Sequence, residues 1–271
     1  KVHIDLFEYG KQNQKSYHLI LVDEATGYLC VEEMKNKTEN EYKRCIKKTI
    51  DLYKSRRYDI KIIATDRETG VLTCESWLNS QGIVLEKCDT GAHDSYAERY
   101  ISSVKSNAIT IEKSLIFNLP IAWHGYLLRN TVQNLNLRPI RHSIESPFEK
   151  FTGSSLFADR HLRCNFGDIL LFTGAYLTKD KEKLPKAYWG IVLERDFNSR
   201  GTKKVLLIDT GKITYLNNFI NDKPPELVLQ KVRSLLKNAG KHQELQINNK
   251  EFDFDKKVGS DIIIPDNLKN V

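Results

Sequence analysis

Three acidic residues that lie far apart in the sequence occupy defined positions in predicted strands and helices. Asp5 lies inside the alternating run of residues 2–7, Asp66 directly follows the apolar run of residues 60–65, and Glu98 lies in the first turn of a predicted amphipathic helix. Ligands of open α/β sheets bind at the carboxyl edge of the strands, so we expect these carboxylates to meet there. Carboxylate oxygens suit Mg²⁺ or Mn²⁺. The pattern predicts a divalent-metal site.

Two of these acids also have a purely structural interpretation. Aspartate is depleted in strands, and Asp5 is equally compatible with an edge strand or an exposed face. Ser95 and Glu98 form the pattern of a capping box, in which Glu98 would bind the backbone N–H of Ser95. One carboxylate cannot easily serve both a cap and two cations, so the two roles of Glu98 compete. The sequence leaves both alternatives open.

Composition bounds the class of protein. The chain has 271 residues, 40% of them hydrophobic, and a net charge of +7 with a pI near 9.0, which favours a polyanionic partner. No apolar run reaches 18 residues and no signal peptide is visible, so we expect no membrane span. The five cysteines are scattered without CxxC spacing, which favours a reduced, intracellular setting and argues against zinc. Because the chain starts at Lys1, we expect it to be a piece of a longer polypeptide.

The elements that must position the three acids follow a recognisable order. A β-β-β-α-β-α-β-α succession predicts an antiparallel meander followed by a crossover, hence a mixed sheet with helices on its faces. The strands are expected at residues 2–7, 16–22, 28–32, 60–65 and 83–85, and the helices at 38–55, 74–80 and from 95 onwards.

Two of these helices carry informative side chains. The first begins at a predicted capping box of Thr38 and Glu41 and is rich in lysine and arginine, which we interpret as a solvated face. The helix of Glu98 has an apolar stripe that includes Ala97 and Val104. Lys105 lies two turns after Glu98 on the same face, where it could hold a phosphate near the metal site.

The remainder of the chain changes character twice. A further helix is expected after Pro120, and residues 137–155 are predicted to be irregular. Residues 156–222 contain four short strand patterns, which predict a small all-β module. Residues 223–271 are predicted to hold a short helix at 227–237 and a linker-like tail.

Several of these segments resemble the integrase region of copia-type long-terminal-repeat retrotransposons. In the core, the similar segments are HIDLF, YHLILVDEATGYLCVEEM, TDRE…WLNSQGI, AHDSYAERYISS and SPFEKFTG. In the β module they are LRCNFGDILLF, KLPKAYWGIVLERD and KKVLLIDTGKITYLNNFI. The resemblance covers roughly residues 1–220, and the order and spacing of the segments make it specific.

The resemblance implies an RNase H-like core (residues 1–155), an SH3-like barrel (156–222) and a poorly defined tail (223–271). Asp5, Asp66 and Glu98 would form a D,D,E triad for two Mg²⁺ or Mn²⁺ ions, with Asp5 bridging both. The chemistry would be 3′-end processing and strand transfer of element DNA into target DNA. Lys105 and Arg99 would contact DNA, and the partners would be double-stranded DNA and further copies of the chain. The expected location is the nucleus, after a cytoplasmic assembly phase.

The sequence departs from the family pattern at the site itself. Only 31 residues separate Asp66 from Glu98, fewer than the family usually has. Glu68 stands where the family commonly has a glycine, Asp94-Ser95-Tyr96 replaces its usual turn, and the amino-terminal His/Cys module is absent. An alternative is therefore a decayed or domesticated DNA-binding protein that no longer cleaves. A third, weaker interpretation is an RNase H-type ribonuclease.

Overall fold

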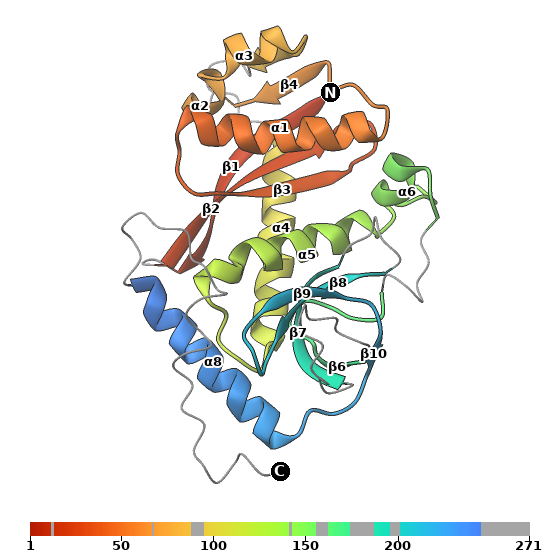
Figure 1. Ribbon diagram of the computed structural model, residues 1–271. Helices are drawn as coiled ribbons and strands as arrows, with labels where there is room; N and C mark the ends of the chain where they lie inside the picture. Colours follow the sequence, from red (N-terminus) through yellow and green to blue (C-terminus); the bar gives the residue numbers. More distant parts are fainter. Residues whose placement is uncertain are drawn as a thin grey trace, which may run out of the picture. The chain divides into compact units, whose positions relative to one another are not determined.

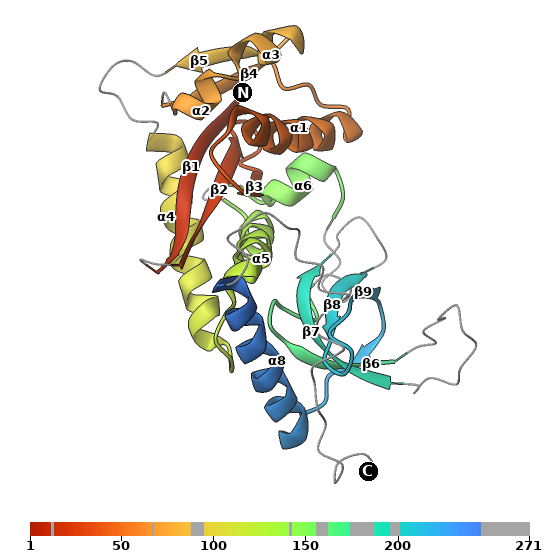
Figure 2. The same cartoon turned by 60° about the vertical axis from the view of Figure 1, so that its left-hand side comes forward.

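A computed structural model describes residues 1–11, 14–66, 68–87, 95–140, 143–155, 162–173, 187–195 and 201–244. The chain divides into two compact units, Lys1–Ser114 with Ile121–Phe157 and Leu115–Pro120 with Ala158–Val271. Figures 1 and 2 together label the strands and α-helices of both units. No helix in these described ranges is long and apolar enough to cross a membrane.

The first unit is built on a mixed five-stranded sheet in the order β3-β2-β1-β4-β5. Its strands are β1 (Val2–Lys11), β2 (Gln14–Asp23), β3 (Leu29–Met34), β4 (Ile62–Thr65) and β5 (Val84–Lys87). β1, β2 and β3 form an antiparallel meander, whereas β4 runs parallel to β1 and β5 parallel to β4. This arrangement confirms the predicted fold class, an RNase H-like α/β domain with a mixed sheet and flanking helices.

Helices cover both faces of this sheet. They are α1 (Glu39–Ser55), α2 (Thr69–Leu72), α3 (Glu75–Ser80), α4 (Ser95–Ser114), η1 (Ile121–Trp123), α5 (His124–Asn136) and α6 (Pro147–Thr152). Figures 1 and 2 show α1 on one side of the sheet and α4 on the other. The core on the α1 side joins Val2 and Ile4 to Tyr42, Cys45 and Ile46, all at most 1% exposed. Burial of this apolar surface, at about 25 cal/mol per Å², stabilises the layered arrangement.

The turn between β2 and β3 has the form expected from its sequence. The N–H of Gly27 donates to the carbonyl of Asp23 (2.8 Å), and that of Asp23 donates to the carbonyl of Tyr28 (2.9 Å). Gly27 has a φ of +71°, which an L side chain rarely adopts. The Asp23 carboxylate also accepts from the hydroxyl and the backbone N–H of Thr26.

Two local predictions in this unit were wrong. Thr38 precedes α1, but its side chain makes no capping hydrogen bond, because its hydroxyl donates to Asn36 and Glu41 accepts from the N–H of Lys35 instead. Residues 137–155 are not wholly irregular, since α6 forms at Pro147. Ser146 and Glu149 complete a full capping box there, and Gly153 ends the helix with φ +64°.

The second unit is an antiparallel sheet followed by a helix. β6 (Ile169–Thr173), β7 (Ala187–Arg195), β8 (Lys203–Leu207), β9 (Ile213–Leu216) and β10 (Phe219–Ile220) pair in the order β10-β6-β7-β8-β9. The all-β module is therefore observed, while its assignment as SH3-like stays a prediction. The helix predicted at residues 227–237 is longer and runs as α8 (Glu226–Glu244). The rest of the predicted tail lies outside the described residues.

Candidate metal-binding site at the sheet edge

Asp5 lies on the central strand of the first sheet. β1 is bonded to β2 on one side and to β4 on the other, which excludes the edge-strand interpretation of this residue. Side chains alternate along a strand, and Val2 and Ile4 enter the core on the α1 side. Asp5 therefore belongs to the opposite face, the one that α4 covers.

Contacts between β1 and α4 show where Asp5 lies along that helix. The ring of His3 is 4.6 Å from that of Tyr96, the Nζ of Lys105 is 5.6 Å from the ring centre of Phe7, and the hydroxyl of Tyr9 donates to Glu112 at 2.6 Å. Strand and helix thus run in the same direction, with their residues in step. Asp5 comes between the first and second of these contacts, beside the first turns of α4.

Asp66 reaches the same level from the neighbouring strand. In the parallel register of β1 and β4, Val2 pairs with Ile63 and His3 with Ala64. Continuing that register by two residues places Asp66 beside Asp5. Asp66 directly follows the last residue of β4, so it occupies the carboxyl edge of the sheet, as the sequence predicted.

The pKa of Asp5 depends on the charges of the neighbouring acids. Partial burial raises the pKa of Asp5, and the negative charges of Asp66, Glu68 and Glu98 raise it further, to about 7. The N–H of Leu6 donates to the Asp5 carboxylate at 2.7 Å and opposes the shift. We call Asp5, Asp66, Glu68 and Glu98 the carboxylate edge.

Glu68 is the member that sequence reasoning missed. The buried Tyr42 of α1 donates its hydroxyl to the Glu68 carboxylate at 2.8 Å, which holds that side chain near the sheet. The available signal was its position, two residues after Asp66 and in place of a glycine that the similar family commonly has. A charged residue at that point of the loop brings a fourth carboxylate to the edge.

The carboxylate edge has the donor chemistry of a divalent-metal site, because Mg²⁺ and Mn²⁺ prefer oxygen ligands. Within the described part of the chain, however, no three His, Cys, Asp or Glu side chains are arranged so that they could already hold a metal ion. The capping alternative for Glu98 involves Ser95, the first residue of α4, whose side chain is not among the described ones, so this alternative stays open. The roles of Asp5, Asp66 and Glu98 as metal ligands therefore stay predictions.

The two predicted DNA-binding residues lie on α4 in different surroundings. Lys105 lies over Phe7 of β1, on the strand that carries Asp5. Arg99 has its guanidinium carbon 5.5 Å from the ring centre of Tyr96 and lines a cavity that none of the carboxylate-edge residues lines. Their contact with DNA stays a prediction.

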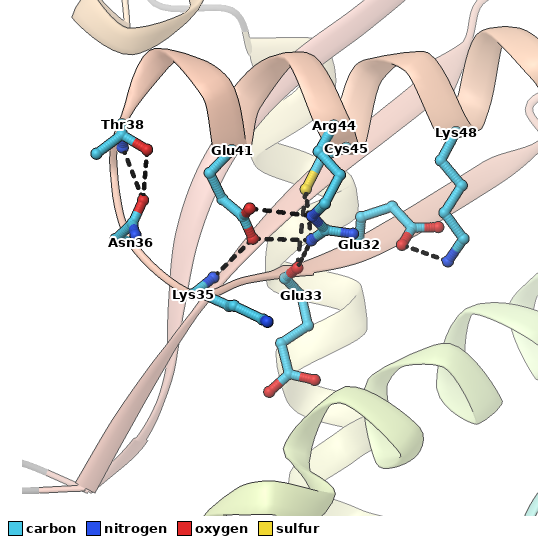
Figure 3. Close-up of polar contacts among 9 residues, drawn as sticks. All are labelled: Glu32, Glu33, Lys35, Asn36, Thr38, Glu41, Arg44, Cys45 and Lys48. Carbon is cyan, nitrogen blue, oxygen red and sulfur yellow. Dashed lines mark hydrogen bonds and ion pairs between the residues drawn. The ribbon is translucent and has the colours of Figure 1, made fainter. Parts of the chain in front are cut away.

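Four of the five basic residues of α1 form ion pairs within the first unit, while the interpretation of this face as merely solvated stays a prediction. The pairs are Lys43 with Glu39, Arg44 with Glu41, Lys47 with Asp51 and Lys48 with Glu32. Figure 3 shows two of them, where α1 passes over the end of β3. Acidic side chains of the same unit thus pair with most of the basic side chains of α1.

Comparison with known proteins gives matches only among solved structures. No family model matches the chain, and no curated protein matches it either. The catalytic core domain of HTLV-2 integrase, solved in complex with magnesium in a trimeric form, is 18% identical with a TM-score of 0.45, over 55% of this chain and 93% of that one. The catalytic core domain of BIV integrase is 15% identical with a TM-score of 0.44, over 56% and 93%.

A larger assembly also matches. A chain of the simian T-cell lymphotropic virus intasome, solved in complex with PP2A regulatory subunit B56 gamma, is 13% identical with a TM-score of 0.49, over 83% of this chain and 78% of that one. Retroviral integrases are thus among the structures that this chain resembles. The chemistry of this chain has to follow from the residues of its own site.

Proposed function

We propose that the chain is a D,D,E-type polynucleotidyl transferase, an integrase that processes the 3′ ends of element DNA and joins them to target DNA. The observation that carries the proposal is the arrangement of three acids from three separate elements. Asp5 lies in the central strand, Asp66 ends its parallel neighbour, and Glu98 lies in the first turn of the helix that packs beside Asp5. The resemblance of the sequence to copia-type retrotransposon integrases supports the same assignment.

Asp5, Asp66 and Glu98 would hold two Mg²⁺ or Mn²⁺ ions, which supply charge neutralisation at the attacking and leaving oxygens. The chain's own contribution is positioning. The central strand fixes Asp5, whose carboxylate is oriented by the N–H of Leu6. Lys105, held over Phe7, would bind a DNA phosphate beside the acids.

The wider biological setting follows from this function. We propose double-stranded DNA, both element ends and target, as the partner, and assembly as a homo-oligomer. The second unit would be an SH3-like module that accompanies the catalytic core. The site of action would be the nucleus, after a cytoplasmic assembly phase.

Two observations favour a second candidate, an integrase-derived DNA-binding protein that no longer cleaves. The described carboxylates do not form a ready metal centre, and the stretch from Asp66 to Glu98 is short. Such a protein would keep the fold and the net charge of +7 while losing metal affinity.

The two candidates are separated by strand transfer with a labelled duplex oligonucleotide in Mn²⁺, together with calorimetry of metal binding. Asp66→Asn is the test variant, and Asp59→Asn, an exposed acid paired with Lys61, is the matched control. For the integrase we expect activity that falls about a thousandfold in Asp66→Asn and is unchanged in Asp59→Asn. DNA binding without metal binding or transfer would overturn the integrase proposal in favour of the binding protein.

A further inference from the structure

A cavity of about 480 Å³ lies in the first unit, away from the carboxylate edge. Its walls come from the β2–β3 turn, from one face of α4 and from Ile140, Ser143 and Lys150. The side chains that give it chemical character are Tyr96, Arg99, Tyr100, Ser103, Ile140 and Lys150. Its volume falls in the range of about 300–1,000 Å³ that is typical of small-molecule sites.

The α4 wall carries aromatic and cationic groups in a helical repeat. Tyr96, Arg99, Tyr100 and Ser103 are three or four residues apart, so they share one face. The rings of Tyr96 and Tyr100 are 5.4 Å apart, and the Arg99 guanidinium lies over the first of them. This wall therefore offers a ring surface beside a positive charge.

A second cation of the lining comes from another element. Lys150 belongs to α6, and no ion pair of its ammonium group is found among the described residues. The acid in the lining, Glu24, has its carboxylate oxygen 3.2 Å from the Nε2 of His3. The two cations, Arg99 and Lys150, thus outnumber the acids of the lining and favour a ligand with negative charge.

The turn wall is shaped by the backbone. A Cβ on Gly27 would come within 2.2 Å of the Cδ1 of Ile140, and the φ of +71° already disfavours other residues there. The turn therefore packs closely against Ile140 in the wall of the cavity. An occupant meets the rings of Tyr96 and Tyr100 together with the cations of Arg99 and Lys150.

We propose that this cavity binds a single unpaired nucleotide, with its base against Tyr100 and its phosphate between Arg99 and Lys150. Bases stack on aromatic side chains with little regard to sequence, and guanidinium and ammonium groups bind phosphate oxygens. The nucleotide is either free or part of a single DNA strand. The second source rests on the proposed function, because a strand that passes α4 would come from the DNA being joined.

The test measures binding without metal, so that it does not depend on catalysis. A fluorescein-labelled single-stranded 12-mer is titrated with the full chain in EDTA by fluorescence anisotropy. The test variants are Arg99→Gln/Lys150→Gln, Tyr100→Ala and Ser103→Trp, of which the last fills the cavity and keeps every charge. The matched control is Lys113→Gln in the last turn of the same helix. Thermal melts confirm that each variant is folded.

We expect roughly tenfold or greater loss of affinity in the charge variant and in Ser103→Trp, and little change in Lys113→Gln. Tyr100→Ala should lower the affinity for an ordinary strand. It should not lower the affinity for a strand of abasic sites, which keeps the phosphates and lacks the bases. Competition by dAMP assigns the cavity to the free nucleotide, and competition only by the unlabelled strand assigns it to DNA.

Unchanged affinity in folded Ser103→Trp and in the charge variant would overturn the proposal. So would equal losses for ordinary and abasic strands in Tyr100→Ala, since the base would then have no role. Either result leaves the strand-transfer test with Asp66→Asn unaffected, so failure of this site and failure of the proposed function are distinguishable.

Discussion

Two acidic clusters of the first unit have different neighbours. At the carboxylate edge, Asp5 lies near other acids, whereas the acids of the second cluster lie beside basic side chains. The second cluster, which we call the α1–β3 cluster, consists of Glu32, Glu41, Arg44 and Lys48 (Figure 3). Arg44 donates to both oxygens of the Glu41 carboxylate, at 2.9 and 3.0 Å, and Lys48 bonds Glu32 at 2.6 Å. Each of these two acids thus has a basic partner from α1.

The pKa values express the difference. Burial tends to raise the pKa of Glu41, but the hydrogen bonds from Arg44 and from the N–H of Lys35 outweigh it, and the pKa ends below its ordinary value. For Asp5, burial is reinforced by the acids Asp66, Glu68 and Glu98, and the pKa rises to about 7. Where neighbouring acids raise the pKa of a partly buried carboxyl group, as they do for Asp5, a divalent cation would relieve the repulsion.

Removing the internal cation of the α1–β3 cluster should have the larger effect on stability. Arg44→Met leaves the nearly buried Glu41 without its ion pair, and we expect a loss of about 1–2 kcal/mol in the free energy of unfolding, because Arg44 itself is half exposed. Urea denaturation measures this loss. Lys47→Met, which breaks the exposed pair with Asp51, is the control and should cost less than about 0.5 kcal/mol. Equal losses in the two variants would show that Glu41 does not depend on internal compensation.

At the carboxylate edge, removal of an acid should stabilise the protein. Wild-type Asp5 has a native pKa of about 7 and an ordinary value of 3.8, so its ionisation opposes folding increasingly from pH 4 to pH 7 and fully above pH 7. Asp5→Asn removes that penalty, and we expect a melting temperature about 2–4 °C higher at pH 8 in EDTA and no difference near pH 4. Thermal melts of both proteins across this range measure it.

The difference in melting temperature between the wild type and Asp5→Asn does not contain the titration of the buried His18 and His124, because that titration occurs in both proteins. Burial lowers their pKa values to about 3 and about 4, so they titrate in both proteins alike. Added Mg²⁺ sharpens the test, since it should raise the melting temperature of the wild type more than that of Asp5→Asn. If Asp5→Asn were less stable than the wild type at pH 8, repulsion between Asp5 and the neighbouring acids would be contradicted.

Much of the first unit was predictable because its elements have local signals. The alternating pattern around Asp5, the apolar run before Asp66 and the turn that ends in Gly27 each specify their own structure, and the crossover rule then fixes the sheet. The helix at Pro147 also has a complete local signal, because Ser146 and Glu149 are spaced as a capping box, although the prolines and the glycine of residues 137–155 favour an irregular segment.

The partners of individual side chains were not predictable in the same way. Thr38 and Glu41 have capping-box spacing, yet Glu41 bonds the N–H of Lys35 and the guanidinium of Arg44, because β3 brings the first of these groups to it. These two groups, on the connection before α1 and one turn further along it, offer Glu41 hydrogen bonds that replace the capping box. Likewise, the tie between Tyr42 and Glu68 joins α1 to the loop after β4, and no spacing rule connects them.

That tie supplies the smallest expected effect and the sharpest check on the carboxylate edge. Glu68→Gln removes one negative charge near Asp5 while keeping an oxygen that accepts the Tyr42 hydroxyl, so the pKa of Asp5 should fall with little change in stability. Carbon-detected NMR titration of the Asp5 carboxyl measures the shift. Glu75→Gln, an exposed acid on α3 paired with Lys87, is the matched control and should leave the titration of Asp5 unchanged. If Glu68→Gln also left it unchanged, burial and the remaining acids would account for the raised pKa of Asp5, and Glu68 would be excluded from the edge.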